Sequence, residues 1–342
     1  MHQHITLETY LAGWARTEPL RSEAASVVLA IARTCTTIAS TIARGDLAGE
    51  LSTVVGGSAG GDEQKMLDVW ANDQLMEALA EAGVAAIASE ELDAPTWLQG
   101  DSCIAVALDP LDGSSNIATN APTGTIFSIL PVSGPATFLQ PGTRQIAGGY
   151  AIYGPQCAFV LTVGKGTLVF ALDPDTRQFR LTGRCITVTQ ASHEYAINAS
   201  NYRHWSHEIR SYIDDCLAGA EGARGADLNM RWIGSLVAEC HRILARGGVY
   251  LYPGDRRRGY ENGRLRLVYE ANPIAFLIEQ AGGKASDGQT RILDLVPTHI
   301  HQRTPLIFGS AEEVDRTARY KGDAGTTFER SPLFASRSLL RT

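Results

Sequence analysis

Residues 104–116, IAVALDPLDGSSN, constrain the fold more than any other part of the chain, because an apolar run ends abruptly in acidic and small polar residues. An unbroken apolar run of this kind is typical of a strand that is buried on both faces. Asp109 and Asp112, then a Gly-Ser-Ser turn, follow at its end. The segment therefore predicts a rigid scaffold that presents carboxylates beside a turn able to bind a phosphate.

Two further acidic clusters follow apolar runs. Residues 84–88 lead into Glu90 and Glu91, and Glu270 lies just before Pro273, where we expect a helix to begin. Each cluster alone is typical of a turn or a solvated loop. Carboxylates at several element ends can converge on one point, however, and Mg²⁺ and Mn²⁺ prefer such hard oxygen ligands. The combination favours a site for divalent cations.

The composition is that of an ordinary globular protein. The chain has 342 residues, 44% hydrophobic and 20% charged, with a formal net charge of -7. This mild negative charge argues against nucleic acid as a partner, because nucleic-acid binding requires a basic surface. We find no apolar run near the roughly 18 residues of a membrane span. No basic segment precedes an apolar core at the N-terminus, so we expect neither a membrane anchor nor a secretory signal.

The cysteines are scattered and form no C-x-x-C pair. This spacing argues against a zinc site and against a disulfide framework. We therefore expect free thiols and a reducing, cytoplasmic location. The six positions are Cys35, Cys103, Cys157, Cys185, Cys216 and Cys240.

Hydrophobic periodicity divides the chain into two regions. Before residue 103 it predicts a helix over 22–44, a Gly-rich loop over 51–61, and a helix over about 62–81 with Asp62 as its N-cap and Asp68 inside it. From 103 to 189 short apolar runs predict a mostly antiparallel meander. The later elements that we expect are helices near 232–246, 273–281 and 311–320 and strands over 249–252 and 305–308.

The order and spacing of these segments resemble those of class I fructose-1,6-bisphosphatase over about residues 20–315. Residues 109–116 alone leave open the wider lithium-sensitive, Mg-dependent phosphatase superfamily, including inositol monophosphatases, and the C-terminal pieces narrow the choice to sugar bisphosphatases. The matching pieces are Gly61-Asp62-x-Gln64-Lys65-x-Leu67-Asp68-Val69, Ser89-Glu90-Glu91, residues 109–116, Gly234-Ser235-Leu236-Val237-Ala238, Leu251-Tyr252-Pro253, Leu265-Arg266-Leu267, Tyr269-Glu270-x-Asn272-Pro273 and Ile300-His301-Gln302-Arg303.

The resemblance implies a layered α/β fold, α-β-α-β-α, with two subdomains. Residues 1–190 would form the N-terminal subdomain, with amphipathic helices, a mostly antiparallel sheet and most metal ligands. Residues 191–332 would form the C-terminal α/β subdomain, which binds the sugar and its 6-phosphate and carries Glu270. We expect residues 333–342 to be a weakly ordered tail.

The resemblance also implies the reaction, which is hydrolysis of the 1-phosphate of D-fructose 1,6-bisphosphate in gluconeogenesis or the Calvin cycle. Two or more Mg²⁺ ions, for which Mn²⁺ could substitute, would be the cofactor. Asp68 and Glu91 would orient and deprotonate the attacking water. The implied metal ligands are Glu90, Glu91, Asp109, the carbonyl of Leu111, Asp112 and Glu270, and the implied 1-phosphate ligands are Gly113, Ser114 and Ser115.

A second phosphate site is implied for the other end of the sugar. In the family an arginine at the position of Arg231 reaches in from a neighbouring subunit, which implies a homo-oligomer, most simply a tetramer. Ser235, Leu236 and Arg264 would touch the furanose ring. The implied ligands of the distal phosphate are Asn198, Tyr202, Arg231, Trp232 and Tyr252.

The chain departs from the family in this second region, which leaves the sugar open. Trp232 replaces a usual tyrosine, Arg264 replaces a usual lysine, Ala199-Ser200 replaces Glu-Gly, and the loop over 254–261 is about two residues longer. A sedoheptulose-1,7-bisphosphatase, or an enzyme for both sugars, is the alternative. A non-catalytic sugar-phosphate-binding protein is the alternative from another class.

Two family modes of regulation find no support in the sequence. The residues that bind AMP in the animal enzymes are replaced here by residues 17–22 and by the pair Cys103-Ile104, and an apolar pair cannot hold a phosphate. We therefore expect weak or absent AMP inhibition. The cysteine-bearing loop of the chloroplast form is missing, which argues against thiol–disulfide light regulation. We expect a structural role for His301.

Overall fold

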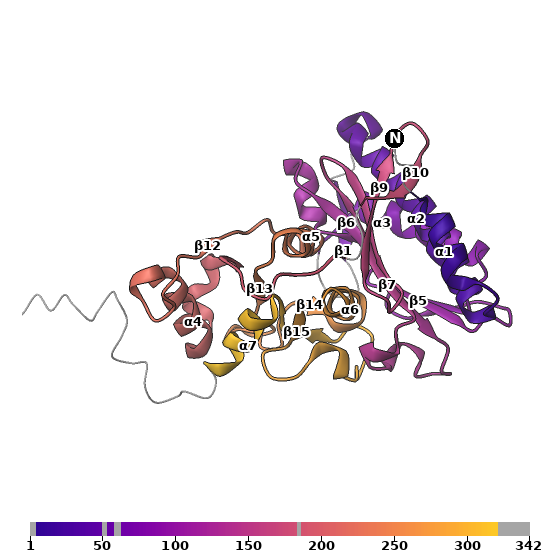
Figure 1. Cartoon of the computed structure of the whole chain (residues 1–342). Helices are drawn as coiled ribbons and strands as arrows, with labels where there is room; N and C mark the ends of the chain where they lie inside the picture. Colours follow the sequence, from indigo (N-terminus) through magenta and orange to yellow (C-terminus); the bar gives the residue numbers. More distant parts are fainter. Residues whose placement is uncertain (1–4, 50–52, 58–62, 183–185, 321–342) are drawn as a thin grey trace, which may run out of the picture.

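The computed structural model describes residues 5–49, 53–57, 63–182 and 186–320, and they stack in five layers, α-β-α-β-α. Figure 1 shows a large sheet with helices on both faces, a smaller sheet beyond the inner helices, and α4 and α7 at the far end. The expected fold class is confirmed. The expected tail over 333–342 and the expected N-cap Asp62 lie outside the described residues.

Within the described residues the larger sheet has eight strands. From β5 to β10 every neighbouring pair is antiparallel, as the predicted meander requires, whereas β3 runs parallel to β5. The strands, in spatial order, are β10 (Gln178–Leu181), β9 (Thr167–Asp173), β8 (Cys157–Thr162), β7 (Ala147–Tyr153), β6 (Thr123–Pro131), β5 (Ile104–Asp112), β3 (Ala86–Ser89) and β4 (Thr96–Trp97).

Two parts of this sheet differ from the prediction. The strand over 178–181 was not predicted. The apolar run over 185–189 was expected as the last strand of the meander, and its described part, 186–189, makes an isolated bridge from Ile186 to Thr167. Strand β5 also continues through Asp109-Pro110-Leu111-Asp112 instead of ending in a turn at Asp109. A bulge between Asp109 and Asp112 accommodates Pro110, which lacks the N–H that a regular ladder needs.

The outer face of this sheet is covered by α1 (Leu7–Ala15), α2 (Pro19–Arg44) and α3 (Met66–Glu81). Helix α2 starts with Pro19 in its first turn and ends at Gly45, whose φ of 51° is easy only for glycine. By length and composition alone α2 could cross a membrane, although we expected no membrane-spanning segment from the sequence. Half of its most apolar window is buried inside the protein, so this is weak evidence for a membrane span.

Helix α3 begins four residues later than predicted. Residues Glu63–Lys65 form β2, which pairs with β1 (Val54–Gly57) inside the segment expected to be a loop. The Asp68 carboxylate accepts a hydrogen bond from Lys65 N at 2.7 Å, and this reverse cap fixes the helix start at Met66.

The smaller sheet lies beyond α5 (Leu236–Arg246) and α6 (Asn272–Gln280), which pack between the two sheets. Helices α4 (His207–Ala218), which was not predicted, and α7 (Ala311–Arg319) cover its other face. Among the described residues its strands, in spatial order, are β12 (Asn229–Met230), β11 (Glu194–Ala196), β13 (Val249–Tyr252), β17 (Leu306–Gly309) and β15 (Lys284–Ser286).

The remaining short elements connect the layers. The pair β14 (Leu265–Arg266) and β16 (Arg303–Thr304) is antiparallel, and a π-helical turn, η7 (Leu267–Ala271), leads into α6. The 3₁₀ turns are η1 (Gly45–Ala48), η2 (Ser114–Thr119), η3 (Thr137–Leu139), η4 (Gly142–Arg144), η5 (Ala199–His204), η6 (Gly219–Glu221) and η8 (Ile292–Asp294).

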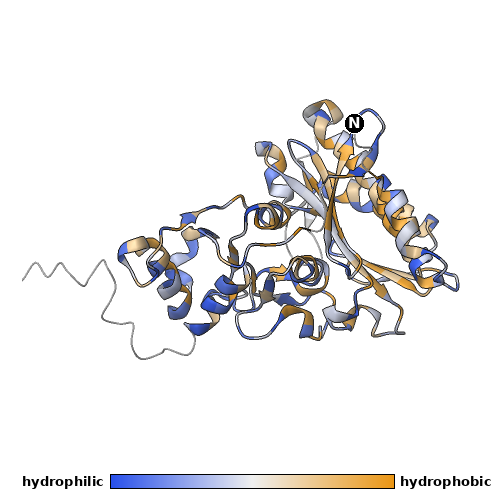
Figure 2. Ribbon diagram, viewed as in Figure 1, coloured by the Kyte–Doolittle hydropathy of each residue, from blue (hydrophilic) through white to orange (hydrophobic). Residues whose placement is uncertain are grey.

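Figure 2 shows hydrophobic residues along the strands of the large sheet and the helices against it, whereas α4 and α7 are largely hydrophilic. The two main clusters of buried apolar side chains lie on the two faces of this sheet. Because apolar residues on both faces hold β3 and β5, the carboxyl ends of these strands are fixed in space.

Gly124 on β6 lets α5 approach the large sheet closely. A Cβ atom there would lie 2.3 Å from Ala151 O and 2.6 Å from Val237 Cγ2. We expect Gly124→Ala to push α5 away and to lower the free energy of unfolding by about 1–3 kcal/mol, measured by urea denaturation. Gly13→Ala is the matched control, because a Cβ at this position in α1 meets nothing within 4 Å. Equal stability of the two variants would contradict the prediction.

Candidate metal centre and substrate pocket

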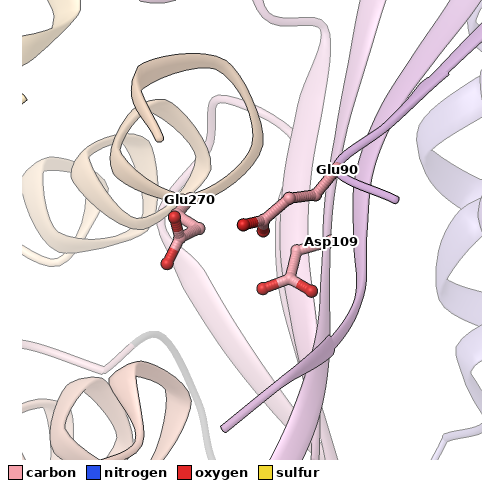
Figure 3. A group of neighbouring side chains, drawn as sticks. All are labelled: Glu90, Asp109 and Glu270. Atoms are coloured by element: carbon pink, nitrogen blue, oxygen red, sulfur yellow. The ribbon is translucent and has the colours of Figure 1, made fainter. Parts of the chain in front are cut away.

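Three carboxylates from three elements converge at the end of the large sheet. One carboxylate oxygen each from Glu90, Asp109 and Glu270 lies within 4.8 Å of the others (Figure 3). Glu90 follows β3, and its N–H donates to Leu108 O at 3.0 Å, which extends the parallel ladder and places Glu90 beside Asp109. The geometry suits a hard divalent cation with oxygen ligands.

Glu270 reaches this point through the π-helical turn η7. Its Oε2 accepts a hydrogen bond from Arg266 N at 2.5 Å, four residues earlier. Such π turns inside helices occur frequently at functional sites. Pro273 follows in the first turn of α6, where a missing N–H costs nothing. The turn therefore presents Glu270 to the carboxyl ends of β3 and β5.

The electrostatics of this centre favour a bound cation. Burial raises the pKa of Asp109 well above its usual value, and the negative charges of Glu90, Asp112, Glu270 and Glu91 raise it further. Burial, followed by the charge of Glu90, likewise raises the pKa of Glu270. Buried like charges are unfavourable unless a cation compensates them. The residues present therefore fit a divalent metal.

A buried arginine, which the sequence analysis did not single out, contributes one positive charge. Arg266 is 1% exposed, and its Nε lies 3.5 Å from Glu90 Oε1. One guanidinium cannot balance several carboxylates, so it compensates the centre only in part. A charged residue within the apolar sequence Leu-Arg-Leu was the available signal, because a buried charge requires a partner.

Asp112 lies near the three carboxylates but is turned toward α5. It accepts hydrogen bonds from Ser235 Oγ at 2.9 Å, from Val237 N at 3.0 Å and from Leu236 N at 3.3 Å. These N–H groups belong to the first turn of α5, where the helix dipole favours a negative charge. Next to it on the bulge, Leu111 N donates to Asp109 Oδ1 at 3.0 Å. Ser235 and Leu236 thus contact a predicted metal ligand in this structure.

Asp68 lies at the Gly113-Ser114 turn and is 2% exposed. Lys65, whose N–H caps Asp68 Oδ2, donates from Nζ to Ser114 O at 2.8 Å. Burial raises the pKa of Asp68, while the Lys65 N–H and Ser114 lower it. Oδ1 of Asp68 has no hydrogen-bond partner among the described residues. This buried oxygen lacks a hydrogen-bond donor beside Ser114, a position that a water or a ligand would fill on entering the site.

The turn and its surroundings require small residues. Gly113 has φ of 73°, and a Cβ there would lie 3.0 Å from Ser235 Cβ, so glycine is needed on both counts. Ser114 and Ser115 begin the 3₁₀ turn that follows.

Glu91 N donates to Ser89 Oγ, which donates to Asn72 Oδ1 at 2.7 Å. Asn72 was not predicted, and its buried amide ties α3 to the Glu90-Glu91 segment.

A separate pocket lies along the smaller sheet. Three predicted substrate residues line it, namely Asn198, Tyr252 and Arg264. Its other lining residues, none of them predicted, are Ile197, Asn201, Trp205, Leu251, Pro253, Asp255, Arg257 and Tyr260. Burial raises the pKa of Tyr252, and Arg264 lowers it in part. The mixture of guanidinium, amide and phenol groups suits a phosphate.

Three of the predicted ligands of the distal phosphate do not line this pocket. The Tyr202 hydroxyl donates to both oxygens of Asp214, at 2.8 and 3.0 Å. Trp232 stacks on Tyr250 with ring centroids 5.8 Å apart. Arg231 is half-exposed, and its Nε lies 3.7 Å from Glu194 Oε1.

His301 bridges two parts of the fold behind the carboxylates. Its Nε2 lies 3.0 Å from Leu92 O, and its ring centroid is 5.5 Å from that of Tyr269. Burial lowers its pKa, so the neutral ring is favoured. His301 therefore connects the residues that follow Glu91 to the π-helical turn η7, which is a structural role.

The chain matches two family models that together span most of its length. Residues 5–184 match the model "Fructose-1-6-bisphosphatase, N-terminal domain", and residues 188–322 match the corresponding C-terminal domain model. The chain is 53% identical over 324 residues to a protein of Azorhizobium caulinodans described as "Fructose-1,6-bisphosphatase class 1", covering 92% of this chain and 99% of that protein.

Other relatives and a solved structure agree. A protein of Rhizobium meliloti with the same description is 52% identical, covering 98% of this chain and 99% of its own length. The crystal structure of Leishmania major fructose-1,6-bisphosphatase in holo form superimposes with a TM-score of 0.86 at 33% identity, covering 94% of this chain and 99% of that one.

Proposed function

The chain belongs to the class 1 fructose-1,6-bisphosphatase family and hydrolyses D-fructose 1,6-bisphosphate to fructose 6-phosphate and phosphate, and we propose that two or more Mg²⁺ ions serve this reaction. The convergence of Glu90, Asp109 and Glu270 is the observation that carries the proposal. Glu91, the Leu111 carbonyl and Asp112 complete the proposed ligand set. When bound, such ions polarise the phosphoryl oxygens and the attacking water.

We propose that Asp68, with Glu91, orients the water and takes its proton. The unused Oδ1 of Asp68 beside the Gly113-Ser114 turn supports this role. Gly113, Ser114 and Ser115 hold the 1-phosphate in this proposal, since backbone N–H groups of such a turn suit an anion.

The distal phosphate is assigned to the separate pocket. Asn198 and Tyr252 line it, which supports this assignment, and Arg264 can reach both the pocket and the furanose. The proposed contributions of Tyr202, Ser235 and Leu236 require their present hydrogen bonds to give way when the sugar binds. Trp232 can keep its ring stacked on Tyr250 while its indole N–H donates to the phosphate.

We further propose a cytoplasmic homotetramer in which Arg231 reaches the distal phosphate of a neighbouring subunit. Its exposure outside the pocket of its own chain is compatible with that role.

The break between the two sheets, from Leu181 to Glu194, supports subdomains over residues 1–190 and 191–332. Gluconeogenesis follows from the family, and a Calvin-cycle role stays a proposal.

Phosphate release from fructose 1,6-bisphosphate tests the function directly. We expect Mg²⁺-dependent turnover that is lost with EDTA and strongly reduced in Asp112→Ala. Turnover that survived both treatments would reject the metal mechanism, and no turnover at all would favour a sugar-phosphate-binding protein. Comparing kcat/KM on sedoheptulose 1,7-bisphosphate in the same assay decides between the two sugars.

AMP should inhibit weakly or not at all, because Ile104 is fully buried in β5 and offers a phosphate no donor. We expect less than about 50% inhibition at about 1 mM AMP. Inhibition at micromolar AMP would contradict this expectation.

A further inference from the structure

The loop between β13 and β14, residues 253–264, builds a cationic wall of the substrate pocket, and one of its two cations, Arg257, is not among the residues that the family resemblance implies. Asp255, Arg257, Tyr260 and Arg264 all line the pocket. Asp255, Arg257 and Tyr260 lie in the loop over 254–261, which is about two residues longer than is usual in the family, and Arg264 follows it. Since Asp255 is the single carboxylate against two guanidiniums, the described lining carries a net positive charge.

Asp255 holds Arg257 in one orientation. Arg257 Nε donates to Asp255 Oδ1 at 3.0 Å, Nη2 donates to Oδ2, and the Arg257 backbone N–H donates to Oδ1 at 2.9 Å. Nη1 takes no part in this pairing, so it can serve a second acceptor. The hydrogen bonds from the Arg257 side chain, together with its backbone N–H and its charge, hold the pKa of Asp255 below its usual value.

Tyr260 brings the two guanidiniums together. The Arg257 guanidinium carbon lies 4.3 Å from the centroid of the Tyr260 ring, and that of Arg264 lies 5.0 Å from it. Each contact is favourable for a cation, so the ring helps to position both side chains. Because Arg257 and Arg264 both line the pocket, a phosphate dianion bound there would meet two guanidinium groups.

Backbone hydrogen bonds within the loop and to η5 fix its conformation. Asp255 N donates to Tyr260 O, and Tyr260 N donates to Arg257 O, both at 3.0 Å. Arg256 N donates to His204 O at 3.1 Å, which fixes the loop to η5 beside Asn198. A pre-ordered loop loses little conformational entropy on binding, so its side chains can contribute fully to affinity.

We propose that Arg257 is a specificity-determining residue that binds the distal phosphate of the sugar bisphosphate, with Asp255 and Tyr260 as its positioning residues. The proposal rests on the proposed function of this site and adds a ligand from the extended loop. A charge-assisted hydrogen bond from Nη1 to a phosphate makes Arg257 a determinant of KM for substrates with a second phosphate, and gives it no part in the chemistry at the 1-phosphate.

Kinetics on two substrates test this. We expect Arg257→Gln to raise KM for fructose 1,6-bisphosphate about tenfold or more with kcat little changed, since a hydrogen bond to a charged group is lost. Hydrolysis of fructose 1-phosphate, which lacks the distal phosphate, should be unaffected. The Kd of fructose 6-phosphate, measured by calorimetry, should rise by the same factor, and Arg257→Lys should recover part of the loss. Arg258→Gln removes the same charge from an exposed position of the same loop and is the matched control.

The outcomes separate the possibilities. Equal KM values for Arg257→Gln and Arg258→Gln, or equal losses on both substrates, would overturn the proposal while the proposed function stood. Failure of the wild-type protein to hydrolyse fructose 1,6-bisphosphate would instead reject the function. If Arg257→Gln does not fold, Asp255→Asn tests the proposal instead, because it keeps the Arg257 cation and removes the carboxylate that orients it. We expect a smaller rise in KM for the bisphosphate alone, and no rise would overturn the proposal.

Discussion

Asp109→Asn should abolish hydrolysis while leaving the fold intact. Asn keeps the acceptor for Leu111 N, so the bulge of β5 retains its hydrogen bond. The amide is a poor ligand for a hard cation, and we expect kcat/KM to fall by more than about 100-fold, the upper end of the loss when an outer-shell partner of a metal ligand is removed. Phosphate release over a Mg²⁺ titration measures this loss.

The same variant should change stability in the opposite direction. Burial and the neighbouring carboxylates raise the pKa of Asp109, so its charge destabilises the metal-free fold at neutral pH. Metal-free Asp109→Asn should therefore melt above the metal-free wild type and gain little on addition of Mg²⁺. Asp101→Asn, at an exposed position just before β5, is the matched control. A wild-type response of Asp109→Asn to Mg²⁺ would show that Asp109 is not a ligand.

The part of the site on the strands was predictable because its signal is local. A strand buried on both faces must be continuously apolar, and the carboxylates then mark where it ends. Residues 104–116 and 84–88 carry that signal, and β5 and β3 bring Asp109 and Glu90 together as expected. Glu270 shares the local signal of an acidic residue after an apolar run, but only tertiary packing brings η7 to the end of those strands.

Elements held by distant partners were not predictable. Strand β1 is a short Val-Val-Gly-Gly segment and β2 is Glu-Gln-Lys, and neither is long enough to show a strand period, so the start of α3 was placed too early. Helix α4 is amphipathic, but its apolar face packs under Trp205, outside the helix. The contribution of Arg257 likewise depended on a loop conformation that brings Asp255 and Tyr260 against it.

Asp68→Asn should separate chemistry from metal binding. Asn can keep the cap on Lys65 N, so α3 should start at the same residue. It cannot take a proton from water, and we expect kcat to fall about 10²- to 10⁴-fold, the usual contribution of a general base. Because Asp68 is not one of the three converging carboxylates, the stabilisation by Mg²⁺ should persist. Turnover and thermal unfolding measured over one Mg²⁺ titration report both quantities.

The contrast with Asp109→Asn makes this result informative. One variant loses activity together with the Mg²⁺ response, and the other loses activity alone. Asp73→Asn, an exposed position on the same helix, controls for the charge change and should match the wild type in both assays. Loss of the Mg²⁺ response in Asp68→Asn would move Asp68 into the metal centre, and wild-type kcat would leave Glu91 as the remaining candidate for the base.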